Sequence, residues 1–267
     1  MEGKSDMNLS RPTALITGAS SGLGAEFASQ LAEDGYDLIL VARGSNFLQR
    51  FARELEANHH IRATPVALDL SKPAAADELW EQIGPEGLWI DVLINNAGVG
   101  ISGPFARSDP NATQSMLELN INTLTTLTRK ALPGMLELGW GHILNVSSVA
   151  GYQAGGPGMA AYYASKSYVL SFTRALAREL RGTGITATAL CPGPIRTSFW
   201  TAAGAQQAGL LRWIPQMHAA HVAASGLRAM RAGRVSVVPG VLNKLTAFLG
   251  ALPPYRISLE VNRLLLR

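Results

Sequence analysis

The sequence predicts an α/β fold: a three-layer, doubly wound parallel sheet in one domain, with a C-terminal helical extension. Short apolar runs alternate regularly with helix-length segments over most of the chain. Hydrophobic residues make up 47% of the 267 residues and charged residues 16%, which is enough apolar material to cover a sheet on both faces. The length suits one domain, because single domains extend to roughly 250 residues.

The first half of the chain repeats a strand followed by a helix. We expect a disordered lead-in over residues 1–11, before the first apolar run. Pro73 suits the first turn of a helix and Gly35 suits a helix end. The predicted strands cover residues 13–17, 36–42, 61–68 and 90–95, and the predicted helices cover residues 22–34, 47–58 and 74–83.

The second half begins with a long helix over residues 111–137, which we expect to bend near Pro133. Beyond it we predict strands at 142–146, 185–190 and 235–238 and helices at 158–181 and 219–232. The tail, 242–267, predicts one or two amphipathic helices separated by Pro253-Pro254. Right-handed crossovers make such a sheet parallel, and ligands bind outside the carboxyl ends of its strands.

Composition argues against several classes of protein. No run approaches the roughly 18 apolar residues of a membrane span, and the start has no apolar signal region, so we expect a soluble, cytoplasmic protein. The one cysteine, Cys191, allows no intrachain disulfide and lies in an apolar context typical of a buried thiol. The net charge of +4 is scattered, which favours a phosphate pocket over a nucleic-acid surface. We expect no metal, because His218 and His221 lack an acidic or thiol partner nearby.

The stretch 147–166 carries the groups for proton transfer. A strand end presents Ser148, and a helix presents Tyr162 and Lys166 four residues apart, on the same face. An ammonium some 4 Å from a phenol lowers its pKa by about three units at most, so we expect Lys166 to bring the pKa of Tyr162 toward neutrality. Tyr163 competes with Tyr162 but lacks the four-residue spacing, so we interpret it as a packing residue.

Glycines at 18, 22 and 24 follow the first apolar run. An isolated glycine triplet is about as consistent with an ordinary turn as with a phosphate loop. A buried strand before it and a helix after it favour the phosphate loop, because glycines let the backbone approach a pyrophosphate at a helix N-terminus.

The second strand ends at Arg43, where an NAD-binding fold of this type would carry an acid for the adenosine ribose. The guanidinium could instead hold a 2′-phosphate, with Ser20 assisting, which predicts NADP(H) in preference to NAD(H). The alternative is a solvent-exposed arginine with no ligand.

Several motifs together resemble the short-chain dehydrogenase/reductase family. They are Thr17-Gly-x-x-x-Gly-x-Gly24, Asn95-Asn96-Ala97-Gly98, Ser148, Tyr162-x-x-x-Lys166 and Pro192-Gly193, in this order over about residues 13–197. The resemblance implies a Rossmann-type domain, a nicotinamide dinucleotide, and reversible hydride transfer between a carbonyl and an alcohol. It also implies a homodimer or homotetramer.

The resemblance assigns roles to individual positions. The catalytic set it implies is Asn120, Ser148, Tyr162 and Lys166, with Asn120 bending the long helix and holding a water in a proton relay to Lys166. Ser147 is then a supporting residue. The cofactor-binding positions it implies, with the residues proposed above, are Gly18, Ser20, Ser21, Gly22, Leu23, Gly24, Arg43, Asp69, Leu70, Asn96, Ala97, Gly98, Tyr162, Lys166, Pro192, Gly193, Ile195 and Thr197.

The predicted organisation is a catalytic domain over residues 12–240 and a tail over 241–267. Residues 198–217 hold aromatic and aliphatic side chains between small residues, which suits a lid over a hydrophobic carbonyl or alcohol as well as simple core packing. The tail could cover its own sheet, pair with another subunit or lie on a membrane surface. The linker from Ser148 to Tyr162 is one residue longer than the commonest family spacing, which we assign to 152–158.

Two rival functions remain at this stage. A catalytically silent nucleotide-binding regulator or scaffold would keep the fold without the reaction, although an intact Ser, Tyr, Lys and Asn set argues against it. Dehydration or epimerisation on the same fold is disfavoured by the glycine spacing and the short length.

Overall fold

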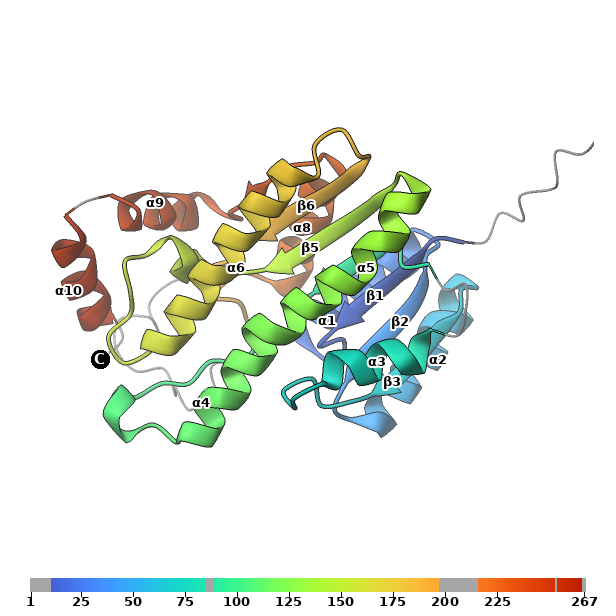
Figure 1. Cartoon of the computed structure of the whole chain (residues 1–267), viewed down its shortest axis with the longest axis horizontal. Coiled ribbons are helices and arrows are strands. Elements are labelled where there is room, and N and C mark those ends of the chain that lie inside the picture. The colour runs from blue at the N-terminus through green and yellow to red at the C-terminus, as the bar shows by residue number, and fades with distance from the viewer. Residues whose placement is uncertain (1–10, 85–88, 197–215, 253, 266–267) are drawn as a thin grey trace, which may run out of the picture.

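The computed structural model describes residues 11–84, 89–196, 216–252 and 254–265, and its centre is a seven-stranded sheet (Figure 1). The strand order is β3-β2-β1-β4-β5-β6-β7, and each neighbouring pair is parallel. The strands are β1 (Thr13–Thr17), β2 (Asp37–Ala42), β3 (Ala63–Ala67), β4 (Val92–Asn95), β5 (Gly141–Val146), β6 (Ile185–Leu190) and β7 (Ser236–Val237). The order turns back between β1 and β4, as the doubly wound prediction requires.

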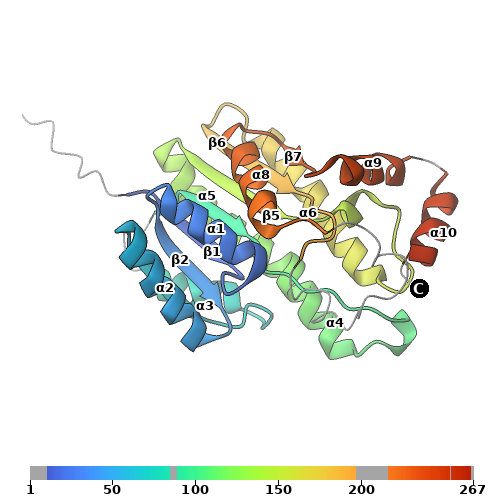
Figure 2. The ribbon, with the colours of Figure 1, turned by 180° about the vertical axis from the view of Figure 1, so that it is seen from behind.

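Helices cover both faces, which confirms the three layers. One face carries α1 (Gly22–Glu33), α2 (Ser45–His59) and α8 (Ala219–Arg231), best seen in Figure 2. The opposite face carries α3 (Ala75–Ile83), α5 (Leu124–Leu138) and α6 (Ala160–Glu179). A one-turn helix, η1 (Phe105–Arg107), and α4 (Pro110–Leu117) precede α5.

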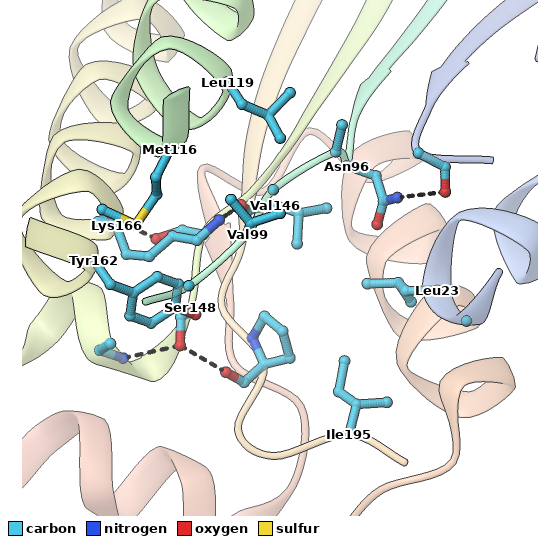
Figure 3. Close-up of a pocket in the computed structure, with 18 of the residues that line it drawn as sticks. Leu23, Asn96, Val99, Met116, Leu119, Val146, Ser148, Tyr162, Lys166 and Ile195 are labelled. Carbon is cyan, nitrogen blue, oxygen red and sulfur yellow. Dashed lines mark hydrogen bonds between the residues drawn. The ribbon is translucent and has the colours of Figure 1, made fainter. Parts of the chain in front are cut away.

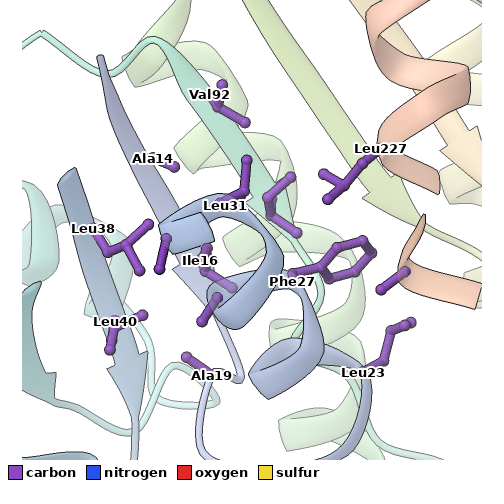
Figure 4. Close-up of a cluster of buried hydrophobic side chains, with 14 of the residues drawn as sticks. Ala14, Ile16, Ala19, Leu23, Phe27, Leu31, Leu38, Leu40, Val92 and Leu227 are labelled. Carbon is purple, nitrogen blue, oxygen red and sulfur yellow. The ribbon is translucent and has the colours of Figure 1, made fainter. Parts of the chain in front are cut away.

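The sheet is buried on both sides because its strands are nearly all apolar. All six residues of β2 are buried, so this strand reads as a continuous hydrophobic run. Phe27 of α1 is fully buried and packs in one cluster with Ile16 of β1 and Leu227 of α8 (Figure 4). This packing fixes the start of α1 against the end of β1, where the glycine loop lies.

The predicted helix over residues 111–137 is interrupted before Pro133. The backbone remains α-helical through Pro133, which lies inside α5. The change occurs at Glu118–Thr123, a π-helical segment that contains Asn120. An extra residue in a turn is common where a helix serves a functional site. The bend expected near Pro133 stays a prediction, and the family role implied for Asn120 falls on the segment that changes.

The tail forms two helices, α9 (Val241–Gly250) and α10 (Tyr255–Leu265), beside the turn η3 (Val149–Tyr152) that follows β5. One side of α9 is buried, through Asn243, Ala247 and Gly250. The other side leaves large apolar residues exposed, among them Val241, Leu242, Leu245, Phe248 and Leu249. In the described part of the chain, no helix is both long enough and apolar enough to cross a membrane. The predicted lead-in except for its last residue, and the predicted lid except for its last two residues, lie outside the described residues.

Candidate active site

One cavity of about 810 Å³ lies along the carboxyl edge of the sheet (Figure 3). The residues that follow β1, β2, β3, β4, β5 and β6 all contribute to its walls. Parallel strands end at one edge, so motifs that are far apart in the sequence meet there.

The glycine loop after β1 can be built only from glycines at two critical positions. Gly18 has φ of +68°, a left-handed conformation that disfavours other residues. A Cβ at Gly24 would lie 2.1 Å from the carbonyl oxygen of Gly18, so the first turn of α1 packs directly on the loop backbone. The loop therefore brings its backbone close to the cavity at the N-terminus of α1, beside the side chains of Ser20, Ser21 and Leu23, which fits the pyrophosphate of a dinucleotide.

Thr17 ties the ends of β1 and β4 together. Its buried hydroxyl accepts hydrogen bonds from the backbone N–H groups of Asn96 and Ala97, both at 3.0 Å, and donates to the carbonyl of Ile94 at 3.3 Å. The Asn96 side chain in turn donates a hydrogen bond from Nδ2 to the backbone carbonyl of Thr17 at 2.9 Å. These bonds fix the wall that Asn96, Ala97 and Gly98 form opposite the glycine loop.

Arg43 and Asp69 form the charged end of the cavity. Arg43 is exposed at the end of β2, and Asp69 follows β3. Partial burial acts to raise the pKa of Asp69, but hydrogen bonds from Ser71 and the charges of Arg43 and Lys72 outweigh it, so the pKa is lowered. Asp69 is thus held as a carboxylate, and the positive charge of Arg43 contributes to this.

Ser148 stands at the other side of the cavity, at the start of η3. Its hydroxyl accepts from the N–H of Ala150 at 3.1 Å and donates to the carbonyl of Pro192 at 3.4 Å. It also forms a side-chain hydrogen bond with Tyr162. Ser147 points elsewhere, because its buried hydroxyl donates to the backbone carbonyl of Lys166 at 2.7 Å. The geometry thus favours Ser148 as the reacting serine and Ser147 as a support for the helix that carries Lys166.

Tyr162 and Lys166 lie on one face of α6, as their spacing predicts. The Lys166 ammonium is 5.9 Å from the centre of the Tyr162 ring and donates to the carbonyl of Val146 at 2.9 Å. Burial raises the pKa of Tyr162 above its ordinary value, and the hydrogen bond with Ser148 only partly opposes this. Burial lowers the pKa of Lys166 to about 8.

The expectation that Lys166 brings the pKa of Tyr162 toward neutrality is therefore wrong for this structure. The site is dry enough for desolvation to dominate the pKa of the phenol and to outweigh the hydrogen bond with Ser148. Tyr162 is held as a neutral phenol, which is a proton donor.

Asn120 lies behind the cavity wall. Its Oδ1 accepts from the N–H of Val99 at 3.0 Å, and its Nδ2 donates to the carbonyl of Val99 at 2.9 Å and to the hydroxyl of Ser165 at 3.1 Å. A Cβ on Gly98 would be 3.2 Å from Asn120 Oδ1 and 3.3 Å from Lys166 Nζ. Asn120 therefore links the π-helical segment to α6 and faces Lys166 across a glycine.

Tyr163, which we interpreted as a packing residue, also contributes to the cavity wall. Its ring covers Gly156, where a Cβ would lie 2.3 Å from Cε2, and it meets the Tyr162 ring edge-on at 6.1 Å. Burial raises its pKa to about 12. It is a packing residue, as predicted, but one that shapes the cavity.

The short-chain dehydrogenase family model matches residues 12–208, which is more than half of the chain. The chain belongs to the short-chain dehydrogenase family. The 3-oxoacyl-(acyl-carrier-protein) reductase FabG of Escherichia coli is 32% identical over 210 residues, covering 78% of this chain and 84% of the reductase.

Solved structures of the family are similar over more of the chain. A short-chain dehydrogenase of Sphingobium yanoikuyae in complex with NADPH has a TM-score of 0.80 and 32% identity, covering 90% of this chain and 93% of the other. A bulky-bulky ketone specific alcohol dehydrogenase of Comamonas testosteroni has a TM-score of 0.75 and 28% identity, covering 91% and 95%. The family and its oxidoreductase fold are thereby established for this chain.

Most of the site positions that the family resemblance implied line the cavity. Gly24 lies under the loop and Asn120 behind the wall, so neither lines the cavity, and Thr197 lies outside the described residues. The predicted positions that do line it are Gly18, Ser20, Ser21, Gly22, Leu23, Arg43, Asp69, Leu70, Asn96, Ala97, Gly98, Ser148, Tyr162, Lys166, Pro192, Gly193 and Ile195.

Two groups of residues escaped the sequence analysis. Thr17 was quoted in a motif without a role, although a hydroxyl at the end of a buried strand could have suggested one. Four residues of the tail, Leu242, Asn243, Thr246 and Asn262, line the cavity. Their one signal in the sequence is that polar residues lie among apolar ones in amphipathic helices. Ordinary surface helices show the same pattern, so it does not indicate a cavity.

Replacing Thr17 by valine should destabilise the fold by about 1–3 kcal/mol, because the N–H groups of Asn96 and Ala97 lose their buried acceptor. The free energy of unfolding in urea measures this. Thr17→Ser keeps the hydroxyl and serves as the matched control. Equal stability of the two variants would show that the hydroxyl contributes nothing.

The depressed pKa of Lys166 predicts a pH dependence of stability. Between about 8 and the ordinary value of 10.5, the unfolded chain binds a proton that the native chain has lost, so native stability rises with pH. Relative to Lys166→Met, the wild-type free energy of unfolding should therefore rise by about 3 kcal/mol from below pH 8 to pH 10.5. Urea titrations at each pH test this, with Lys244→Met at an exposed position as control. A constant gap between wild type and Lys166→Met would refute it.

Proposed function

We propose that the chain is an NADP(H)-dependent oxidoreductase that interconverts a hydrophobic ketone or aldehyde with its alcohol. The observation that carries the proposal is that Ser148, Tyr162 and Lys166 converge on the cavity that the glycine loop also lines. A proton donor, a hydrogen-bond donor for the substrate oxygen and a dinucleotide cradle are the parts such a reaction needs. The proposed location is the cytoplasm.

The cofactor would be held by the glycine loop, Arg43, Asp69 and the wall from Asn96 to Gly98, and the nicotinamide would lie near Pro192-Gly193. When bound, it supplies the hydride for reduction or accepts it in oxidation. Two glycines that tolerate no Cβ give the loop its close approach. The chain's own residues then handle the substrate oxygen and its proton.

In the reductive direction Tyr162 donates its phenolic proton to the substrate oxygen. Its raised pKa keeps the phenol protonated at neutral pH, which suits a general acid. Ser148 orients the same oxygen by turning its one hydroxyl hydrogen from the carbonyl of Pro192, a contact of 3.4 Å, to the substrate, while the N–H of Ala150 holds the hydroxyl oxygen in place.

Lys166 is positioned to support the tyrosinate that remains after proton donation. With a pKa of about 8, the Lys166 side chain is mainly an ammonium at neutral pH. Its hydrogen bond to the backbone carbonyl of Val146 holds it near the phenol. Asn120 faces the ammonium across Gly98, which supports its proposed role in returning a proton from solvent.

The preference for NADP(H) rests on Arg43, because the end of β2 offers a guanidinium where a ribose-binding acid would favour NAD(H). The NADPH complex of the Sphingobium yanoikuyae relative supports it. A homodimer or homotetramer is proposed, and the apolar residues exposed on α9 support an association between subunits.

A hydrophobic substrate is supported by the apolar walls near Tyr162, which include Val99, Ile101, Met116 and Leu119. The bulky ketones named for the Comamonas testosteroni enzyme are consistent with it.

Tyr162→Phe should lower turnover by at least about a hundredfold, because it removes the general acid while keeping the ring. NADPH oxidation with a panel of hydrophobic ketones measures turnover, and fluorescence titration should give an NADPH affinity close to wild type. Tyr163→Phe is the matched control and should retain activity. Full activity in Tyr162→Phe would refute the assignment.

Arg43→Ala should lower the ratio of kcat/KM for NADPH to that for NADH by roughly tenfold to a hundredfold, the value of a charge-assisted hydrogen bond. Steady-state kinetics with both cofactors and one ketone measure the ratio. An equal or better rate of the wild type with NADH, or an unchanged ratio in the variant, would contradict the preference.

A further inference from the structure

The tail closes the end of the cavity that lies away from Arg43. Helix α9 contributes Leu242, Asn243 and Thr246 to the wall, and α10 contributes Asn262. These helices lie beyond residue 208, where the family match ends. This part of the cavity is therefore built by residues outside the family match.

Specific contacts hold the tail against the loop that follows Ser148. The Nδ2 of Asn262 donates to the carbonyl of Gly155 at 2.6 Å, and the Nε2 of Gln153 donates to the carbonyl of Thr246 at 3.4 Å. The Gln153 amide lies on Gly250, where a Cβ would be 2.7 Å from Cδ. Gln153 and Asn262 both line the cavity, and each amide joins the tail to the loop that follows Ser148.

Charge is distributed unevenly around the cavity. Among the described residues that line it, the only ones with a side chain charged at neutral pH are Arg43, Asp69 and Lys166. The first two belong to the cofactor end and the third to the reacting centre. The tail end offers amides and hydroxyls between apolar side chains, so a charged group placed there would lose water without gaining a counter-ion.

The side-chain amide oxygens of Gln153 and Asn262 can accept hydrogen bonds from a ligand. Asn262 is 3% exposed, and its Nδ2 is engaged by Gly155, but no described residue donates to its Oδ1. Gln153 likewise uses its Nε2, and no described residue donates to its Oε1. Because both residues line the cavity, a ligand bound there can donate a hydrogen bond to these amide oxygens.

We propose that Gln153 and Asn262 form a distal subsite for an uncharged hydrogen-bond donor, a hydroxyl or amide N–H, at the end of the substrate remote from its carbonyl. The substrate class is then an extended, neutral hydrophobic ketone or aldehyde with such a donor at its far end. This rests on the proposed function, because the carbonyl must be placed at Tyr162.

The test uses three aryl ketones of the same length, with a terminal hydroxyl, methyl or carboxylate group, and measures kcat/KM of the full chain with saturating NADPH. The wild type should prefer the hydroxyl over the methyl ketone by roughly 3- to 10-fold, the value of one neutral hydrogen bond, and should use the carboxylate least well. Gln153→Met and Asn262→Leu, which keep the side-chain shapes, should each lower the hydroxyl-to-methyl ratio, because the two amide oxygens share the one hydroxyl hydrogen, and the double variant should bring it close to 1.

The ratio separates recognition from a merely structural role, because a misplaced loop would slow both ketones together and leave their ratio unchanged. Gln82→Met, an exposed amide on α3, is the control and should keep the wild-type ratio. Gln153→Met keeps the test decisive if the buried Asn262 variant fails to fold. A wild-type ratio near 1, a ratio unchanged in the folded variants, or a preference for the carboxylate overturns the subsite alone. No NADPH oxidation with any ketone overturns the proposed function and the subsite with it.

Discussion

The buried ammonium of Lys166 constrains the site more than any other group. A charge that leaves water must be compensated by hydrogen bonds, and here the carbonyl of Val146 at the end of β5 supplies one at 2.9 Å. Ser147, the next residue, holds the backbone of Lys166 itself. The strand end and α6 are thus fastened together at two adjacent residues, and this fixes the distance between Ser148 and Tyr162 on either side.

The opposite wall follows from the same requirement. A Cβ at Gly98 would be tight, because Asn120 Oδ1 and Lys166 Nζ would lie 3.2 and 3.3 Å from it. Thr17 and Asn96 then fix the backbone just before Gly98 to the end of β1. The cofactor cradle and the proton-transfer groups therefore belong to one hydrogen-bonded frame, which explains why motifs so distant in the sequence occur together.

The sequence was sufficient where a single local rule decides the structure. The sheet follows from apolar runs such as β2, and the shared face of Tyr162 and Lys166 follows from helix geometry. The sequence was insufficient where the surroundings of a residue decide its properties. The pKa of Tyr162 depends on how dry its surroundings are, and the position of the helix irregularity depends on what Asn120 contacts in α6 rather than on Pro133. Neither the pKa nor the position of the irregularity can be read from the spacing of residues in the sequence.

The tail shows the same limit for a different reason. Its pattern predicts amphipathic helices, but an apolar stripe does not say which surface it meets, and α9 in fact places its polar residues Asn243 and Thr246 toward the cavity while large apolar residues stay exposed. The contacts that hold it, such as Asn262 to Gly155, reach loop backbone and not the proton-transfer groups. Changes in the tail can therefore alter the substrate end of the cavity while Ser148, Tyr162 and Lys166 keep their positions. Substrate recognition and proton transfer are in this way separable within one domain.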